Sequence, residues 1–127
     1  MTKADDPHIY VLRVLEDYEE ALATGTMVDA SLESEGFIHA SPADQLTRVA
    51  NKYYRGRGQV VCCVVDPTKL QAELQWEPAA GGLYPHIYGP LNMDAVVRTV
   101  PLRVDAEGHF DIRPGDLEAA RATNAAD

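Results

Sequence analysis

Four side chains have the types and the spacing that acid–base chemistry or ligand binding requires: His39 in the segment GFIHAS, Glu77 in QWE, and His86 and Tyr88 in YPHIYGPL. A histidine can exchange a proton near neutral pH, and a glutamate can act as a base or accept a hydrogen bond from a sugar hydroxyl. An imidazole and a phenol that face a cleft can also stack on a nucleotide. We therefore predict catalytic roles for His39, Glu77 and His86. Tyr88 is predicted to bind the ligand.

Ser41 and Arg48 extend this candidate site toward an anion. His39 and Ser41 have the same side-chain parity on a predicted strand, so they project together. Ser41 is predicted to cap the helix that follows, with Pro42 as its first residue. The unpaired N–H groups at such a helix start favour a phosphate, which Arg48 would also reach. Ser41 and Arg48 are therefore predicted to bind the ligand.

Each of these residues also has a purely structural interpretation. His39 would then be a partly buried histidine beside a helix cap, and Arg48 a surface charge. Glu77 would be a solvated residue at a strand end, although Trp76 beside it favours partial desolvation and a raised pKa of the carboxyl. The segment 84–88 would be an aromatic edge strand that closes the core.

The familiar catalytic and metal-binding motifs are missing from the sequence. It contains no G-x-S-x-G, no P-loop and no G-x-G-x-x-G pattern. Its histidines and cysteines form no H-x-H, H-E-x-x-H or C-x-x-C pattern, so no metal site is predicted. Cys62 and Cys63 are adjacent within an apolar run, where they are predicted to be core residues and neither disulfide partners nor nucleophiles.

The elements that must position these side chains are early helices and later strands. The predicted helices cover residues 15–23, which end at Gly25, and the segment after Ser41, with Leu46, Val49, Ala50 and Tyr53 as its buried stripe. The predicted strands cover 8–12, 36–40, 59–66, 72–77 and 83–88, followed by a hairpin of 95–104 with 109–112. Residues 27–35 and 78–82 are predicted to be irregular. About seven strands and two main helices predict an α+β fold with a mostly antiparallel sheet.

Two patterns predict where strands lie in the sheet. The run VVCCVV over residues 60–65 shows no alternation of apolar and polar residues, so it predicts a central strand that is buried on both faces. Pro85 removes a backbone donor, so its strand is predicted to lie at an edge or beside a bulge.

Length and charge indicate one small domain and count against two classes of partner. The 127 residues predict a single domain, ordered over about 8–113, with a short helix that frays over 114–127. Eleven basic and twenty acidic residues leave a net charge of −9, which counts against a partner such as duplex DNA or an anionic membrane. No apolar run is long enough for a membrane span, and no signal peptide is recognisable, so a cytoplasmic protein is predicted.

The succession GFIHAS, VANKYYRG, VVCCVVDPTKL, QWE and YPHIYGPL resembles the domain-of-unknown-function 952 family of small, mostly bacterial proteins. The resemblance covers about residues 9–112, and the first and last segments in this order make it specific. The family in turn looks like a relative of the ADP-ribosyltransferase fold. That relation implies a split, mostly antiparallel sheet and a cleft for a nicotinamide dinucleotide.

The same resemblance implies roles for three residues. It assigns ribose binding to His39, stacking on nicotinamide to Tyr88 and stabilisation of an oxocarbenium-like sugar to Glu77. Many relatives carry a basic residue after the aromatic residue of the first strand, where this sequence has Val11. That difference favours a member that has lost its activity.

Three functions remain open from the sequence. The first is an enzyme that uses a nucleotide such as NAD or ADP-ribose, with NAD as its cofactor, and acts at the anomeric carbon of the ribose. The second is a non-catalytic module that binds a nucleotide or metabolite. The third is an accessory protein whose aromatic segment 84–88 pairs with the sheet of a partner.

Overall fold

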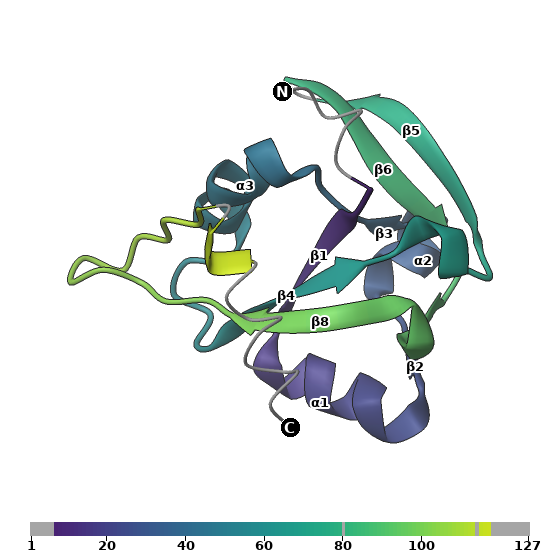
Figure 1. Ribbon diagram of the computed structural model, residues 1–127, viewed down its shortest axis with the longest axis horizontal. Helices are drawn as coiled ribbons and strands as arrows, with labels where there is room; N and C mark the ends of the chain where they lie inside the picture. Colours follow the sequence, from purple (N-terminus) through teal and green to yellow (C-terminus); the bar gives the residue numbers. More distant parts are fainter. Residues whose placement is uncertain (1–6, 80, 114, 118–127) are drawn as a thin grey trace.

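Three small antiparallel sheets form the framework of the computed structural model, which describes residues 7–79, 81–113 and 115–117 (Figure 1). The first sheet has the order β1–β4–β8, with β1 at Ile9–Val14, β4 at Val60–Val65 and β8 at Val96–Pro101. The second pairs β2 (Thr26–Met27) with β7 (Leu91–Asn92). The third has the order β3–β6–β5, with β3 at Ile38–His39, β6 at Gly82–Tyr88 and β5 at Glu73–Ala79. The predicted α+β class with mostly antiparallel strands is confirmed.

Residues 115–117 form a short helical segment within the predicted tail helix. The other helices lie in the first half of the chain, as predicted. They are α1 (Leu15–Thr24), α2 (Ala30–Ser34) and α3 (Leu46–Tyr53), with 3-10 turns at Ala43–Gln45, Pro67–Lys69 and Met93–Ala95. Helix α1 ends at Gly25, which takes a left-handed φ of 86° and donates from its N–H to the carbonyl of Ala21. No helix in the described ranges is both long and apolar enough to span a membrane.

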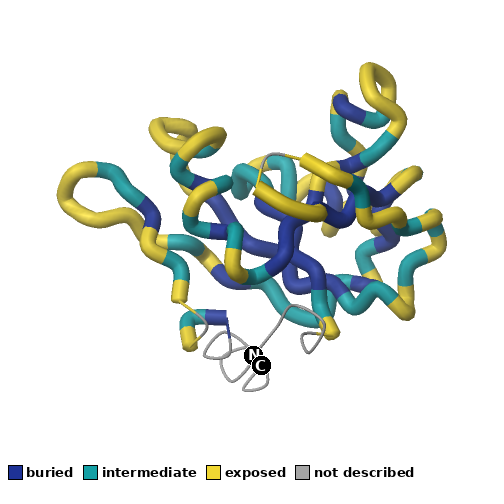
Figure 2. The backbone as a smooth tube through the Cα atoms, turned by 90° about the horizontal axis from the view of Figure 1, so that it is seen from above, coloured by how far each residue is buried: buried dark blue, intermediate teal, exposed yellow. Residues whose placement is uncertain are grey.

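Strand β4 lies at the centre of the first sheet, which confirms the prediction from its unbroken apolar run. One face packs with Ile9 and Val11 against α1 and the inner face of the third sheet. The other face packs with Tyr10 and Leu12 against α3. Figure 2 shows the resulting buried centre. Burial raises the pKa of the Cys63 thiol to about 12 and that of Cys62 further, so both cysteines are core residues.

The prediction that Pro85 places its strand at an edge or beside a bulge is wrong, because β6 lies between β3 and β5 and its register with β5 runs without a shift past Pro85. In an antiparallel sheet, the N–H and C=O of one residue point to the same neighbouring strand. The carbonyl oxygen of Pro85 accepts a hydrogen bond from Ala40 N at 3.1 Å, on the side of β3. The missing N–H of Pro85 therefore removes no hydrogen bond to β5. Strand β3 ends at His39, so no residue of β3 lies opposite Pro85 and requires its N–H as a donor.

The hairpin turn and the segment before β3 also differ from prediction. Residues 78–82 are predicted to be a loop, but β5 and β6 pair as far as Ala79 and Gly82, so the turn is tight.

Residues 27–35 are predicted to be irregular, but they contain the end of β2 and helix α2. The cause is Asp29, whose side chain accepts a hydrogen bond from Ser31 N and so caps α2.

Ser41 does not cap a helix, contrary to the sequence prediction. Its backbone forms an isolated bridge with Tyr10, in which Ser41 N donates at 2.8 Å and Ser41 O accepts at 3.0 Å. A 3-10 turn follows, and α3 begins only at Leu46, without a side-chain cap. Leu46 and Ala50 are buried as predicted, but Tyr53 is 58% exposed. Tyr54 packs inward in its place and donates to the carbonyl of Leu12.

We expect Ser41→Ala to change the free energy of unfolding by less than about 0.5 kcal/mol, because the bridge to Tyr10 uses backbone atoms alone. Loss of a true helix cap would cost about 1 kcal/mol. Urea unfolding of the variant distinguishes the two values. A loss of the larger size would show that the hydroxyl does stabilise the start of α3.

Side chains of α3 hold the segment that was predicted as a strand over 109–112. The 105–108 turn forms, but the segment after it makes an isolated bridge between Val104 and Phe110. Asn51 then donates to Phe110 O at 2.9 Å and accepts from Phe110 N at 2.8 Å. Thr47 makes the same pair of bonds with the backbone of Ile112. Of the predicted tail, residues 118–127 lie outside the described part of the chain.

An ion pair between Arg13 and Asp29 joins β1 to α2. The Arg13 side chain is mostly buried, contacts the Asp29 carboxylate and donates to Val28 O at 3.1 Å. Partial burial of Asp29 opposes its ionisation, but the hydrogen bonds from Ser31 and Arg13 together outweigh that cost. They lower the pKa of Asp29 from 3.8 to about 2.

The Asp29 pair is expected to make stability depend on acid pH. Because the pKa of Asp29 is lower in the folded chain, its contribution is present above about pH 4 and is lost as the pH falls toward 2. The contribution is about 1 kcal/mol after allowance for solvent screening of this group, whose side chain is 31% exposed. Urea unfolding of the wild type and of Asp29→Asn, which keeps a capping side chain, should differ at pH 6 and converge at pH 2. A difference that is independent of pH would contradict this role.

Candidate functional site

The four predicted site residues on β3, β5 and β6 lie on one face of the third sheet, which we call the outer face. The register pairs His39 with His86 and Glu77 with Tyr84, so His39, Glu77 and His86 share this face. The outer face comprises Phe37, His39, Glu73, Gln75, Glu77, Tyr84, His86 and Tyr88. The opposite face carries Ile38, Leu74 and Ile87 into the core.

Glu77 links His86 to Tyr88 through one carboxylate oxygen. Glu77 Oε1 lies 2.7 Å from His86 Nδ1 and accepts a hydrogen bond from Tyr88 Oη at 2.6 Å. The hydrogen bonds from Tyr88 and His86 lower the pKa of Glu77. The bond between Tyr88 and Glu77 also raises the pKa of Tyr88. The expectation of a raised Glu77 pKa is wrong, because Trp76 points to the other face of the sheet and is itself 44% exposed.

The Glu77 carboxylate determines which nitrogen of His86 carries a proton. An ionised carboxylate can only accept a hydrogen bond, so Nδ1 of His86 must be the donor. In the neutral ring, the lone pair then lies on Nε2. Among the described residues, the hydrogen bonds of His86 involve Nδ1, which leaves Nε2 to accept a proton from a ligand. The His86 side chain is 9% exposed, whereas the Glu77 side chain is 36% exposed, so the imidazole is shielded from most of the solvent and the carboxylate lies nearer the surface.

Phe37, which the sequence analysis missed, lies at the centre of the aromatic side chains. Its ring stacks on His86 with the centroids 4.0 Å apart and an interplanar angle of 14°. It lies 4.9 Å from the ring of His39 and 5.2 Å from that of Tyr88. Its position two residues before His39 gives it the parity of the outer face, and this signal was available in the sequence.

His39 forms a second histidine–carboxylate pair beside the first. Its Nε2 lies 3.2 Å from Glu35 Oε2, at the C-terminal end of α2. Its ring meets that of His86 edge-on, with the centroids 5.5 Å apart. The His39 side chain is 57% exposed, so it lies at the surface, whereas His86 lies beneath it and Phe37.

Ser41 and Arg48 do not join the histidine–carboxylate group. Ser41 is buried in the bridge to Tyr10. Arg48 Nε donates to Gln45 Oε1 at 2.9 Å, and its guanidinium contacts the hydroxyl of Tyr84. Tyr84 lies on the outer face, so Arg48 reaches the end of that face near the β5–β6 turn. The predicted anion site at a helix start beside His39 is not formed, because α3 begins at Leu46.

Val11, where many relatives were expected to carry a basic residue, is not part of the outer face. Its side chain is almost fully buried in the core with Ile38 and Ile87, on the inner side of the third sheet. A valine at this position therefore removes no polar group from the cluster around His86.

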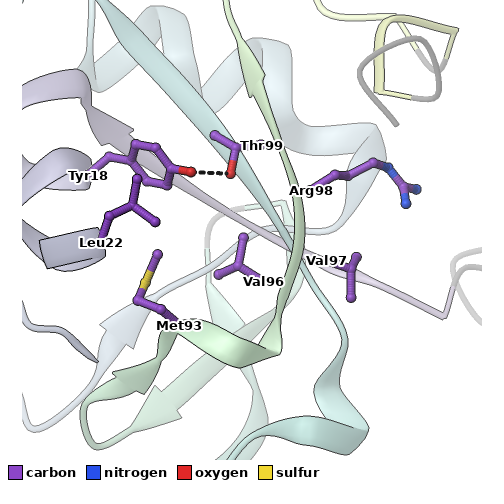
Figure 3. Close-up of a pocket in the computed structure, with 7 residues that line it drawn as sticks. All are labelled: Tyr18, Leu22, Met93, Val96, Val97, Arg98 and Thr99. Carbon is purple, nitrogen blue, oxygen red and sulfur yellow. Dashed lines mark hydrogen bonds between the residues drawn. The ribbon is translucent and has the colours of Figure 1, made fainter. Parts of the chain in front are cut away.

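A pocket and a cluster of polar side chains lie elsewhere in the described part of the chain. A pocket of about 260 Å³ lies between α1 and β8 (Figure 3), where Tyr18 Oη and Thr99 Oγ1 are 3.0 Å apart beside Leu22, Met93 and Val96. Arg98 extends away from the other side of β8, and no histidine or carboxylate lines the pocket. The pocket is therefore lined mainly by apolar side chains and lacks the acid–base groups of a catalytic site.

The turn at residues 105–108, which we call the hairpin tip, brings together Asp105, Glu107 and His109. Their potential metal-ligand atoms lie within 4.8 Å of one another. The Asp105 carboxylate already accepts hydrogen bonds from His109 N and Glu107 N, both at 2.9 Å, which lower its pKa. These bonds give the carboxylate a structural role in the turn.

Comparisons with known proteins place the chain among proteins of unknown function. Residues 13–99 match the model of a family described as "Protein of unknown function (DUF952)". The crystal structure of protein CC0527 from Caulobacter crescentus is 33% identical, with a TM-score of 0.77 over 88% of this chain and 98% of that chain. The solution NMR structure of CC0527 is 33% identical, with a TM-score of 0.70 over 82% of this chain and 91% of that chain. No curated protein matches the chain.

Proposed function

The chain belongs to the DUF952 family of proteins of unknown function. We propose that it is a small-molecule enzyme in which His86 exchanges a proton with its substrate at Nε2. The observation that carries the proposal is the pair between Glu77 Oε1 and His86 Nδ1, at 2.7 Å. A carboxylate in this position orients the imidazole, selects its tautomer and stabilises the imidazolium that forms. The expected reaction class is proton abstraction or hydrolysis with His86 as the general base.

The neighbouring side chains support this role for His86. Tyr88 donates to the same oxygen of Glu77, which limits the movement of the carboxylate. Phe37 covers one face of the imidazole and keeps the pair partly dry. His39, held by Glu35, is the second acid–base group within reach of a ligand on the outer face. In this proposal Glu77 and Tyr88 are positioning residues.

A second candidate is a site for a nucleotide such as NAD or ADP-ribose, with chemistry at the anomeric carbon. It is favoured by the contact of Phe37 with His39 and Tyr88, and of Tyr88 with Glu77, because the resemblance assigns sugar and nicotinamide binding to these three residues. Ser41 and Arg48 lie outside this group, so they do not support binding of the pyrophosphate there. A non-catalytic binding module would use the same side chains.

To test the proposed function, the protein is incubated with a panel of metabolites that includes NAD, ADP-ribose, esters and lactones, and NMR is used to monitor their conversion. We expect at least one compound to be converted, with a rate about 100-fold lower in His86→Gln. The matched control His109→Gln, at the exposed hairpin tip, should retain the wild-type rate. An equal rate in His86→Gln would overturn the role of His86. Binding without turnover of any compound would favour the non-catalytic module.

A further inference from the structure

We infer that the outer face selects a small organic cation, with a substituted ammonium group, over neutral and anionic ligands of the same shape. The inference rests on the proposed function for the location of the site and adds the class of ligand. Two independent properties of the outer face carry it, namely its charge and its accessible aromatic rings.

The charge around the histidines is negative. Three carboxylates, those of Glu35, Glu73 and Glu77, border the aromatic group, and two of them contact its histidines directly. Arg48 lies at the other end of the face, where it binds Gln45 and Tyr84. A ligand anion near Phe37 would therefore face carboxylates at short range, whereas a cation would be attracted. The net charge of −9 acts in the same direction at long range.

The aromatic rings offer a cation their π faces, which carry the negative end of the ring quadrupole. Tyr88 is 38% exposed, and its ring lies 5.2 Å from that of Phe37. Cations bind over such rings at centroid distances of up to about 6 Å. In the described structure, the hydrogen bonds of Glu77 end on Oε1, so Oε2 is left to face a ligand cation. Aromatic rings beside a carboxylate provide the two interactions that an ammonium group requires.

The test compares three ligands of one shape: choline, its neutral isostere 3,3-dimethylbutan-1-ol, and the anion 3,3-dimethylbutanoate. We expect calorimetric titration to give a Kd for choline about tenfold lower than for the alcohol, and the weakest binding for the anion. Glu77→Gln and Phe37→Leu should each remove most of the preference for choline. The matched control Glu107→Gln, at the exposed hairpin tip, should leave it unchanged.

The inference would be overturned if choline did not bind, or if it bound no more tightly than the alcohol. It would also be overturned if a Glu77→Gln variant with the melting temperature of the wild type kept the full wild-type preference for choline. The His86→Gln variant separates this result from the proposed function. Turnover that depends on His86 without a preference for cations would contradict the ligand class alone. A preference for cations that persists in His86→Gln, without turnover by the wild type, would support the ligand class and contradict the enzyme.

Discussion

A Cys62→Asp variant is expected to be unfolded under conditions in which the wild type is folded. Cys62 is fully buried in β4, and its register partners are Leu12 on β1 and Val100 on β8. A carboxylate there would have an apolar register partner on each neighbouring strand. The cost of several kcal/mol is comparable with the whole stability of a small domain, about 5–15 kcal/mol. Circular dichroism and urea titration of the purified variant measure the outcome.

Two controls separate charge from volume at the centre of the sheet. Cys62→Ala removes the thiol without adding charge, so it should stay folded with a loss of about 1–2 kcal/mol. Val61→Asp should be less damaging than Cys62→Asp, because the register partner of Val61 on β1 is Arg13, a cation, whereas the partner of Cys62 is Leu12. Cooperative unfolding of Cys62→Asp near the wild-type midpoint would show that β4 is not central.

An Asn51→Ala variant is expected to lose about 3 kcal/mol of stability. The Asn51 side chain satisfies both the N–H and the C=O of Phe110, and it also donates to Thr47 O at 3.0 Å. Its removal would leave the N–H and C=O of Phe110, a residue that is only 4% exposed, without these partners, each at a cost of about 1–3 kcal/mol. Urea unfolding gives the loss in stability. Hydrogen exchange at the Phe110 amide should increase more than exchange in β4.

Thr47 provides the matched comparison on the same helix face. Thr47→Ser keeps the hydroxyl that bonds to Ile112 N and Ile112 O, so it should cost far less than Thr47→Val, which has nearly the same shape without the hydroxyl. Equal stability of Thr47→Val and Thr47→Ser would contradict side-chain anchoring of this segment.

Much of the candidate site follows from strand parity alone. His86 and Tyr88 stand two residues apart, as do Phe37 and His39, and alternation places each pair on one face of its strand. The contact between the two pairs depends on the pairing of β3 with β6, which joins residues about fifty positions apart. Glu77 reaches His86 across a second register, between β5 and β6. The register of β3 with β6 is not marked by a turn, whereas that of β5 with β6 follows from the tight turn between Ala79 and Gly82, where the sequence predicts a longer loop over 78–82.

The sequence by itself determined the features whose physical cause is local. An unbroken apolar run leaves no polar face, so β4 had to be central, and Gly25 had to end α1 because it adopts the left-handed φ at low cost. Only the tertiary structure decided the features that depend on distant partners. The backbone of Ser41 forms a bridge with Tyr10, so Ser41 does not cap a helix. The backbone at Phe110 and Ile112 forms hydrogen bonds with the side chains of Asn51 and Thr47 in place of a neighbouring strand. Backbone groups take whichever partners the packed chain brings near, and local preferences of about 1 kcal/mol are too weak to prevent it.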